Sequence, residues 1–230
     1  MATHVNTIAV IGGTGAEGGG LALRWAHAGH RVIIGSRDAA KARTAAAELN
    51  ALLAGTTVEG ADVKSAATAA EIVVLTVPFT AQRTTIETIR DELRGKILID
   101  VTVPLVPPKV SVVQLPATDS CVVAIQELLG PEVRVVSAFQ NVSAHKLRDL
   151  TYKIACDVLV CGNDKAARQI AIDLAHDAGL RGIDAGPLSN SVVAESLTSA
   201  LIWINRTYKV RDSGIVITGL DGTFGASEPE

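Results

Sequence analysis

The sequence predicts an α/β protein built on a doubly wound parallel sheet, with a smaller α/β part at its C-terminus. Apolar strand-like runs alternate with helical stretches along the 230 residues, as in repeated β-α-β units. The first apolar run, 7–11, breaks into a glycine-rich turn and continues as an alanine- and leucine-rich helix over 16–28. Aromatic residues make up only 3%, so Ala, Val, Ile and Leu must fill the core, which is typical of parallel sheets buried on both faces.

The glycine-rich turn has the spacing G-x-G-x-x-G. Gly13 permits the tight turn from strand to helix, Gly15 lets the backbone approach a pyrophosphate, and Gly18 lets the helix pack close to the sheet. Free N–H groups at the N-terminus of the helix would then hold the phosphates. Because the motif follows a strand and opens a helix, it predicts a dinucleotide site of the Rossmann type, with contacts from Gly13, Thr14, Gly15, Ala16, Glu17 and Gly18.

The residues after the second strand, 31–34, select the nucleotide. A cofactor without a 2′-phosphate calls for Asp or Glu about 20 residues past the glycines. Here Ser36, Arg37 and Lys41 offer a hydrogen-bond donor and two positive charges, which suit a 2′-phosphate and predict NADP(H). In the alternative, Arg37 is a solvated surface arginine and Asp38 binds the ribose of NAD.

The later elements follow the same alternation. A helix over 39–53, ending at Gly55, precedes a weak third strand over 58–60. We then expect a strand over 72–77, a helix over 80–93, a strand over 96–101, a helix over 120–129 within an irregular segment, and a strand over 133–138. The C-terminal part predicts a strand over 157–161, a helix over 164–178, a strand over 181–185, a long helix over 191–208, a last strand over 215–218, and a loose tail from 219.

Two strands of the first half end in motifs on the expected ligand side. In doubly wound sheets, ligands bind outside the carboxyl ends of the strands. The segments 76–79 and 100–104 lie at such ends, and each contains a proline, which fixes a turn and frees neighbouring backbone groups. The alternative is that these prolines only terminate strands. The motifs assign to the cofactor site Thr76, Val77, Pro78 and Val101.

Composition and charge narrow the function classes. The net charge of −3 argues against nucleic acid as the main partner. No apolar stretch reaches the roughly 18 residues of a membrane span and no signal peptide precedes the first strand, so we expect a cytoplasmic protein without a membrane partner. Cys121, Cys156, Cys161 and the five scattered histidines lack the spacing of metal ligands, so we expect buried structural thiols and no metal.

These motifs resemble those of the NADPH-dependent reductases of coenzyme F420, an 8-hydroxy-5-deazaflavin. The similarity covers nearly the whole chain and lies in the glycine-rich stretch, Ser36-Arg37, Thr76-Val-Pro78, Val136-Ser-Ala-Phe139, Val160-Cys-Gly-Asn-Asp164 and Asp184-Ala-Gly-Pro-Leu-Ser-Asn190. The resemblance implies an NADP-binding Rossmann domain over 1–145 and a smaller domain over 146–230, which completes the sheet, the acceptor site and a homodimer. The deazaflavin ring would then lie over the nicotinamide, in the cleft between the two parts.

One position departs from the family pattern. The family usually carries a histidine in the loop after Ala138, where this chain has Gln140; both side chains can donate a hydrogen bond. Hydride transfer depends on positioning and on exclusion of water, so no catalytic residue is certain, and Thr102, Gln140 and Asn141 are the candidates for contacts to the acceptor. The remaining expected contacts in the site are Val142, Ser143, Ala144, Leu188 and Ser189.

The sequence leaves three functions open. The first is hydride transfer between NADP(H) and coenzyme F420. The second is NADPH-dependent reduction of a flavin or of a small carbonyl or imine compound, since folds of this class carry many activities. A related branch, the NADPH-binding domains of membrane metalloreductases, also resembles this chain and reduces an ordinary flavin. The third is an NADP sensor, which would not need the second set of strand-end motifs at 186–190.

The long helix over 191–208 predicts a homodimer interface. Its apolar residues recur at helical spacing, and one of them is a tryptophan whose large apolar surface we expect a chain of this size not to cover fully by itself. In the alternative, the helix only covers the sheet. The residues expected at the interface are Leu197, Leu201, Trp203 and Ile204.

Overall fold

The computed structural model describes residues 4–53, 55 and 58–220. The strands are β1 (Thr7–Ile11), β2 (Arg31–Ser36), β3 (Val58–Asp62), β4 (Ile72–Leu75), β5 (Ile97–Asp100), β6 (Arg134–Ser137), β7 (Asp157–Gly162) and β8 (Arg181–Asp184). The α-helices are α1 (Ala16–Ala28), α2 (Ala39–Asn50), α3 (Val63–Ala69), α4 (Phe79–Thr88), α5 (Cys121–Leu129), α6 (Lys165–Asp177) and α7 (Ser191–Tyr208). Short 3-10 helices are η1 (Asp91–Leu93), η2 (Ala144–Lys146) and η3 (Leu188–Asn190).

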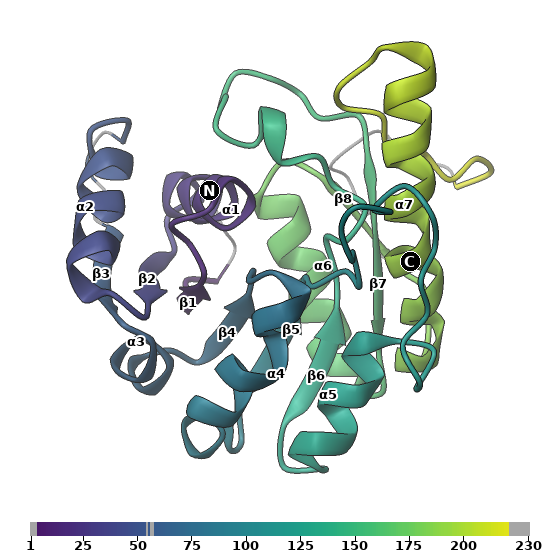
Figure 1. The fold of residues 1–230 in the computed structure, drawn as a ribbon. Helices are drawn as coiled ribbons and strands as arrows, with labels where there is room; N and C mark the ends of the chain where they lie inside the picture. The colour runs from purple at the N-terminus through teal and green to yellow at the C-terminus, as the bar shows by residue number, and fades with distance from the viewer. Residues whose placement is uncertain (1–3, 54, 56–57, 221–230) are drawn as a thin grey trace.

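The strands of the described chain form one sheet in the order β3-β2-β1-β4-β5-β6-β7-β8 (Figure 1). From β3 to β6 every neighbouring pair is parallel, and the strand order reverses between β1 and β4. The predicted doubly wound α/β fold is therefore confirmed. One junction differs from the prediction of a parallel sheet, because β6 and β7 pair antiparallel. The connection between them contains only η2, and without a crossover helix β7 starts at the edge where β6 ends.

Helices cover both faces of the sheet (Figure 1). Alternate strand residues point to opposite faces, so Ile8 and Val10 pack with α1, α2 and α6, whereas Ala9 and Ile11 pack with α3, α4 and α5. All four strand residues are at most 1% exposed. The buried strands explain the nearly continuous apolar runs in the sequence.

Three elements differ from the prediction. The helix α3 was not predicted; its seven residues are too few for a periodic signal, and its first turn is capped by Asp62, whose carboxylate accepts from Ser65 N. The helix expected over 80–93 ends at Thr88 and is followed by η1. The strand expected over 215–218 is wrong: Ile215 accepts one hydrogen bond from Asp157 N, and no ladder follows. Most of the tail expected from 219 lies outside the described residues.

The sheet runs without a break across the boundary expected at residue 145. A buried arginine of α1, Arg24, also joins the two sides, because its guanidinium donates to backbone carbonyls of Lys146, Leu147, Asp149, Tyr152 and Ala178. These bonds fix the segment that follows η2 against α1. Within the described chain, no helix combines the length and the apolar character needed to cross a bilayer.

Candidate functional site

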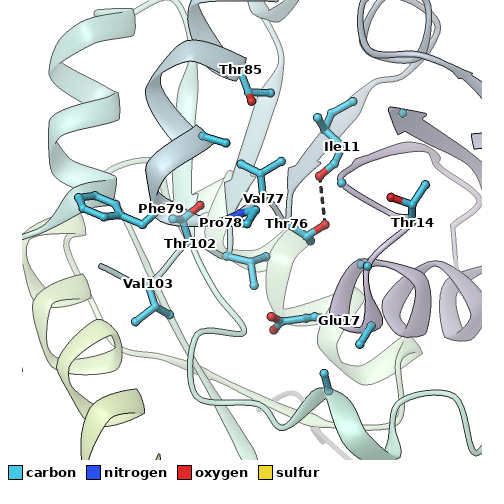
Figure 2. A pocket seen from close by; sticks show the side chains of 18 of the residues that line it. Ile11, Thr14, Glu17, Thr76, Val77, Pro78, Phe79, Thr85, Thr102 and Val103 are labelled. Carbon is cyan, nitrogen blue, oxygen red and sulfur yellow. Dashed lines mark hydrogen bonds between the residues drawn. The ribbon is translucent and has the colours of Figure 1, made fainter. Parts of the chain in front are cut away.

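A cavity of about 570 Å³ lies at the carboxyl ends of β1, β2, β4 and β5 (Figure 2). Its walls come from the glycine-rich turn, from the residues that follow β2, β4 and β5, from the segment 140–144, and from Thr198 of α7. It coincides with the reversal of strand order between β1 and β4, the point at which doubly wound sheets bind dinucleotides. Figure 2 shows Glu17 of α1 below Thr76 of the β4 end, with Thr14 of the turn to one side and Thr102 of the β5 end to the other.

The glycines of the turn have distinct steric environments. Gly15 is the N-cap of α1, so no side chain caps the first N–H groups of the helix, and a Cβ on it would meet only Gly12 O, at 3.4 Å. A Cβ on Gly18 would lie 2.2 Å from Thr76 Oγ1, which shows how closely α1 packs on the end of β4. Gly12 has φ of 90° and lies against Thr76 O, so it too requires glycine. The N–H groups of Gly12, Gly13 and Gly15 donate to backbone carbonyls, so the uncapped N–H groups at the start of α1 are the ones that fit a pyrophosphate.

The end of the cavity at β2 favours NADP(H). Ser36 and Arg37 line it. Asp38 does not line it, because its carboxylate caps α2 by accepting from Ala40 N at 2.9 Å and Lys41 N at 3.2 Å. The carboxylate required by the NAD alternative is therefore engaged in the fold. The Lys41 side chain is exposed on the first turn of α2 and lies outside the cavity lining.

The opposite end contains buried polar atoms without partners among the described residues. They are Thr102 Oγ1 and Gln140 Oε1. The Gln140 amide donates from Nε2 to Asp100 O at 2.7 Å, and Thr198 Oγ1 donates to Gln140 O at 2.7 Å. The fold therefore uses the donor of the Gln140 amide and leaves its acceptor unpaired, whereas the expectation from the sequence was a donor to the ligand. Unpaired buried polar atoms are costly, so these two fit the polar edge of a bound ligand.

The loop that carries Gln140 has a strained backbone. Phe139 adopts φ of 74°, an uncommon value for a bulky residue, although its side chain is completely buried. Its ring packs edge-on against Trp25 of α1, with centroids 5.8 Å apart. This packing holds the turn after β6 and directs the next residue into the cavity.

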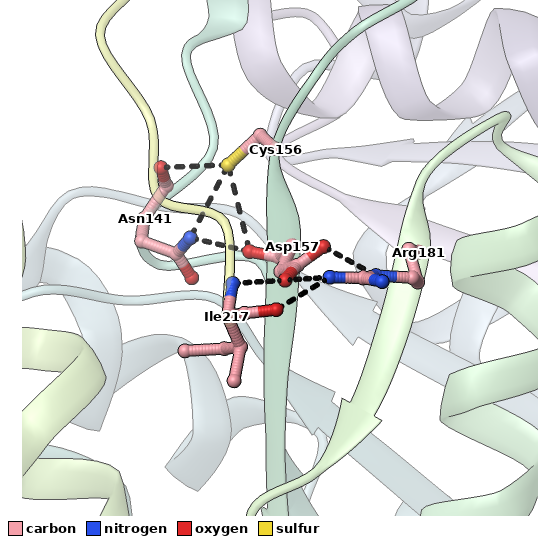
Figure 3. A network of polar contacts seen from close by, with 5 residues as sticks. All are labelled: Asn141, Cys156, Asp157, Arg181 and Ile217. Atoms are coloured by element: carbon pink, nitrogen blue, oxygen red, sulfur yellow. Dashed lines mark hydrogen bonds and ion pairs between the residues drawn. The ribbon is translucent and has the colours of Figure 1, made fainter. Parts of the chain in front are cut away.

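Asn141 lies outside the cavity lining. Its Nδ2 donates to Asp157 O at 2.7 Å and contacts Cys156 Sγ at 3.4 Å (Figure 3). The Asp157 carboxylate in turn pairs with Arg181 at 2.6 Å and accepts from Ile217 N. Burial raises the pKa of Asp157, but Arg181 and Ile217 N–H outweigh it and hold the pKa below its usual value. In this network Asn141 braces the start of β7, which is not the acceptor contact expected from the sequence.

Two carboxyl groups near the cavity have raised pKa values. Burial raises the pKa of Glu17 to about 8. Burial also raises the pKa of Asp100 to about 6, opposed by hydrogen bonds from Thr102 N at 2.9 Å and Gln82 Nε2 at 2.7 Å. Asp100 is fully engaged by these bonds. Glu17 lines the cavity, and its Oε1 atom has no partner among the described residues.

The structure brings most of the expected site residues together. Those in the lining are Thr14, Gly15, Ala16, Glu17, Gly18, Ser36, Arg37, Thr76, Val77, Pro78, Val101, Thr102, Gln140, Val142 and Ala144. Those outside it are Gly13, Lys41, Asn141, Ser143, Leu188 and Ser189. Leu188 is buried in the core beside α5, and Ser189 is exposed, so the turn 186–190 does not form a wall of this cavity.

Further lining residues were missed by the sequence analysis. They are Ile11, Gly12, Gly35, Val63, Phe79, Ala81, Thr85, Val103, Leu105 and Thr198. The doubled glycine at 12–13 and the strand-end segment 100–104 were signals for some of them. Thr198 gave no signal, because it is one threonine within the long helix α7.

The cysteines are the buried thiols that the sequence predicts. Cys121, Cys156 and Cys161 are all buried and free. Burial raises the pKa of each thiol, which keeps it protonated and unreactive. Among the residues that the structure describes, no group of three or more His, Cys, Asp or Glu side chains could hold a metal ion.

Comparison with known proteins agrees with this site. A family model described as NADP oxidoreductase coenzyme F420-dependent matches residues 7–104. The F420-dependent NADP reductase of Methanocaldococcus jannaschii is 40% identical over 222 residues, which cover 93% of this chain and 99% of that protein. The F420-dependent NADP reductase of Methanothermobacter thermautotrophicus is 43% identical over 223 residues, which cover 94% and 96%.

A solved structure shows the same similarity. The crystal structure of a protein from Arthrobacter sp. FB24, provisionally described as an F420-dependent NADP reductase, matches with a TM-score of 0.75 at 29% identity. The match covers 92% of this chain and 98% of that one. With the two methanogen enzymes at 40% and 43% identity over almost the whole chain, the protein belongs to the family of F420-dependent NADP reductases.

Proposed function

We propose that the protein transfers hydride between NADP(H) and coenzyme F420. The observation that carries this proposal is that one cavity joins three features: the open glycine turn, the Arg37 end without a free carboxylate, and the unpaired polar atoms at Thr102 and Gln140. The first two fit a dinucleotide with a 2′-phosphate. The third fits a second ring with a polar edge. The names of the relatives supply the identity of that ring.

The chain's own residues bind and orient the reactants. The uncapped backbone N–H groups at the start of α1 hold the pyrophosphate, and Arg37 pairs with the 2′-phosphate. The nicotinamide supplies or receives the hydride when bound. Thr102 and Gln140 orient the polar edge of the deazaflavin, and apolar walls such as Val77, Pro78 and Val101 exclude water.

The proposal divides the chain into a nucleotide-binding part over 1–145 and a smaller part over 146–230. In support, Thr198 alone among the described lining residues comes from beyond 145. The smaller part contributes this wall and the outer strands β7 and β8. The cytoplasmic location stays a prediction.

Reduction of a small carbonyl compound fits the site less well. Such a reaction needs a proton donor beside the new alkoxide, and His, Lys and Tyr often serve. No His, Lys or Tyr is among the described lining residues, and the one protonated acid there is Glu17, in the first turn of α1. A ring that accepts hydride at carbon needs positioning instead.

The test mixes the enzyme with NADPH and, separately, with F420, FMN, FAD and a panel of small carbonyl and imine compounds, following the nicotinamide absorbance. Turnover with F420 alone is expected. Turnover with FMN or FAD but not F420 would indicate a flavin reductase, and reaction only with a carbonyl or imine would overturn the assignment. As a matched pair, Thr102→Val and Gln140→Leu should lower F420 turnover while the NADPH dissociation constant stays within about twofold, because both residues lie at the acceptor end.

We also propose a homodimer through the outer side of α7. Val193, Trp203 and Tyr208 are 59%, 59% and 72% exposed, and with Ile204 they share one side of the helix. Leu201 is buried inside the chain, so it does not belong to this face as the sequence analysis expected.

A second apolar segment continues the face. Arg206 of α7 donates to Ser111 Oγ at 3.0 Å, so the exposed Val112 and Val113 lie beside the helix. Light scattering should show a dimer for the wild type and a monomer for Trp203→Glu. Leu52→Glu is the matched control, because Leu52 is 58% exposed just after α2, which lies across the molecule from α7 (Figure 1), and its change should leave the dimer intact. A monomeric wild type at micromolar concentration would contradict the proposal.

A further inference from the structure

Glu17 carries a carboxyl group that the fold does not use. It lies in the first turn of α1, and its Oε1 atom is buried without a hydrogen-bond partner among the described residues. Figure 2 shows the side chain directed into the cavity beneath Thr76. Burial raises the pKa of Glu17 to about 8, so the group is a neutral acid at pH 7. An unpaired buried carboxyl costs stability, which suggests that it serves a bound ligand.

Its place in the cavity is on the nicotinamide side. Arg37 follows β2, on one side of β1, and marks the adenosine end. The first turn of α1 abuts the end of β4, on the other side of β1, because a Cβ on Gly18 would lie 2.2 Å from Thr76 Oγ1. The two halves of a dinucleotide lie on either side of the reversal of strand order. The nicotinamide half would therefore lie over β4 and β5, beside Glu17.

The neighbouring charged groups leave Glu17 unpaired. Arg37 is the other charged side chain among the described lining residues, and the α4 and β4 walls add none. From β5, Asp100 turns its carboxyl to Thr102 N and Gln82. No ion pair or hydrogen bond within the described chain joins Glu17 Oε1 to the basic residues of η2 and the segment after it, which are His145, Lys146 and Arg148.

We propose that Glu17 compensates the charge of the oxidised nicotinamide. The carboxyl is protonated beside the neutral dihydronicotinamide of NADPH and ionised beside the cationic ring of NADP⁺. When the bound NADPH gives its hydride to the deazaflavin ring and becomes NADP⁺, the Glu17 O–H bond breaks, one proton leaves to solvent, and the carboxylate balances the new ring charge. This inference rests on the proposed binding of NADP(H) in this cavity.

The direction of the effect follows from electrostatics. A nearby cation favours the ionised form of a carboxyl, and more strongly where water is excluded. The phosphates of the nucleotide oppose ionisation, but they do so equally in the NADP⁺ and NADPH complexes. The ratio of the two dissociation constants, Kd(NADP⁺)/Kd(NADPH), therefore isolates the ring charge. As pH rises, this ratio falls by up to about tenfold per pH unit until Glu17 is ionised in both complexes.

The experiment measures both dissociation constants by calorimetry from about pH 6 to pH 9, in the wild type, Glu17→Gln and Glu17→Ala. Across this range the wild-type ratio should fall by about tenfold or more, and the ratios of both variants should stay constant. Calorimetry in two buffers of different ionisation enthalpy should also show proton release on NADP⁺ binding to the wild type and none for Glu17→Gln. Circular dichroism confirms that the variants are folded.

The control variant is Asp100→Asn. This variant removes the other buried carboxyl with a raised pKa near the site, although Asp100 does not line the cavity. The ratio Kd(NADP⁺)/Kd(NADPH) of the variant should therefore fall with rising pH as it does in the wild type. A constant wild-type ratio, or an equal fall in Glu17→Gln, would overturn the inference while nucleotide binding stands. Failure of the wild type to bind either nucleotide would instead overturn the proposed function, and this inference with it.

Discussion

Adding one methyl group at Gly15 should weaken nucleotide binding without straining the fold. Its φ of −81° and ψ of 173° are extended values that any residue adopts. A Cβ there would meet only Gly12 O, at 3.4 Å, which is an ordinary contact. Gly15→Ala therefore leaves the fold unstrained, yet it places a methyl group where the backbone must approach the pyrophosphate.

Gly15→Ala should raise the thermal stability of the protein and lower its affinity for NADPH. Replacing glycine by alanine at a compatible backbone position stabilises a protein by about 0.4–1 kcal/mol, through the entropy of the unfolded chain. For a chain of this size, that raises Tm by about 1–4 °C. A hydrogen bond to a charged phosphate contributes about 1.5–3 kcal/mol, so the loss of one raises the NADPH dissociation constant by about 10- to 150-fold. Thermal unfolding without nucleotide and a fluorescence titration with NADPH measure the two effects.

Gly18→Ala is the matched comparison within the same motif. Its Cβ would lie 2.2 Å from Thr76 Oγ1, 2.9 Å from Gly13 Cα and 3.0 Å from Gly12 O, so the backbone must shift. Overpacking of this kind costs about 1–3 kcal/mol, and Tm should fall. If Gly15→Ala lost as much stability as Gly18→Ala, the steric argument would be refuted. Unchanged NADPH affinity in Gly15→Ala would show that the phosphates do not lie against this turn.

Three further substitutions test other parts of the site. Arg37→Ala should raise the NADPH dissociation constant by about tenfold or more and leave that of NADH unchanged; equal wild-type affinity for both nucleotides would contradict this. Because the pKa of Asp100 rises from 3.8 to about 6 on folding, this group lowers the wild-type free energy of unfolding as pH rises from about 4 to 6. Urea unfolding should show Asp100→Asn gaining stability relative to wild type across that window and no further above it. Gln140→His should keep or increase the rate of F420 reduction in rapid mixing; a large loss would show that the Gln140 oxygen is required.

The sequence predicted the elements whose signals are local. The signals for β1, α1 and β2 are apolar runs, the spacing of glycines and a high content of helix-forming residues. Each of these signals lies within a few residues of the element that it specifies. The bounds of α1 and α7 match the expected 16–28 and 191–208. The nucleotide end of the cavity was accessible for the same reason, since one turn and one strand end supply most of it.

The elements that failed depend on distant contacts. The antiparallel pairing of β6 and β7 follows from a connection without a crossover helix, and no composition signal marks that absence. The segment 215–218 has the residue types of a strand, but the Asp157 side chain takes the Ile217 N–H that a ladder would use. Asn141 was a plausible ligand contact by residue type, and its amide is engaged by the backbone of β7.

Motif spacing in the sequence cannot predict whether the Gln140 amide leaves its donor or its acceptor for a ligand. An amide can present either a donor or an acceptor, and here Asp100 O takes the Nε2 donor from 40 residues away while Thr198 fixes the backbone from 58 residues away. The atom left without a partner among the described residues is therefore Oε1, the acceptor. A ring bound against it must offer an N–H, as the imide edge of a deazaflavin or flavin does, whereas a simple ketone has none. The same contact that the sequence could not orient thus favours the ring acceptors over the carbonyl compounds.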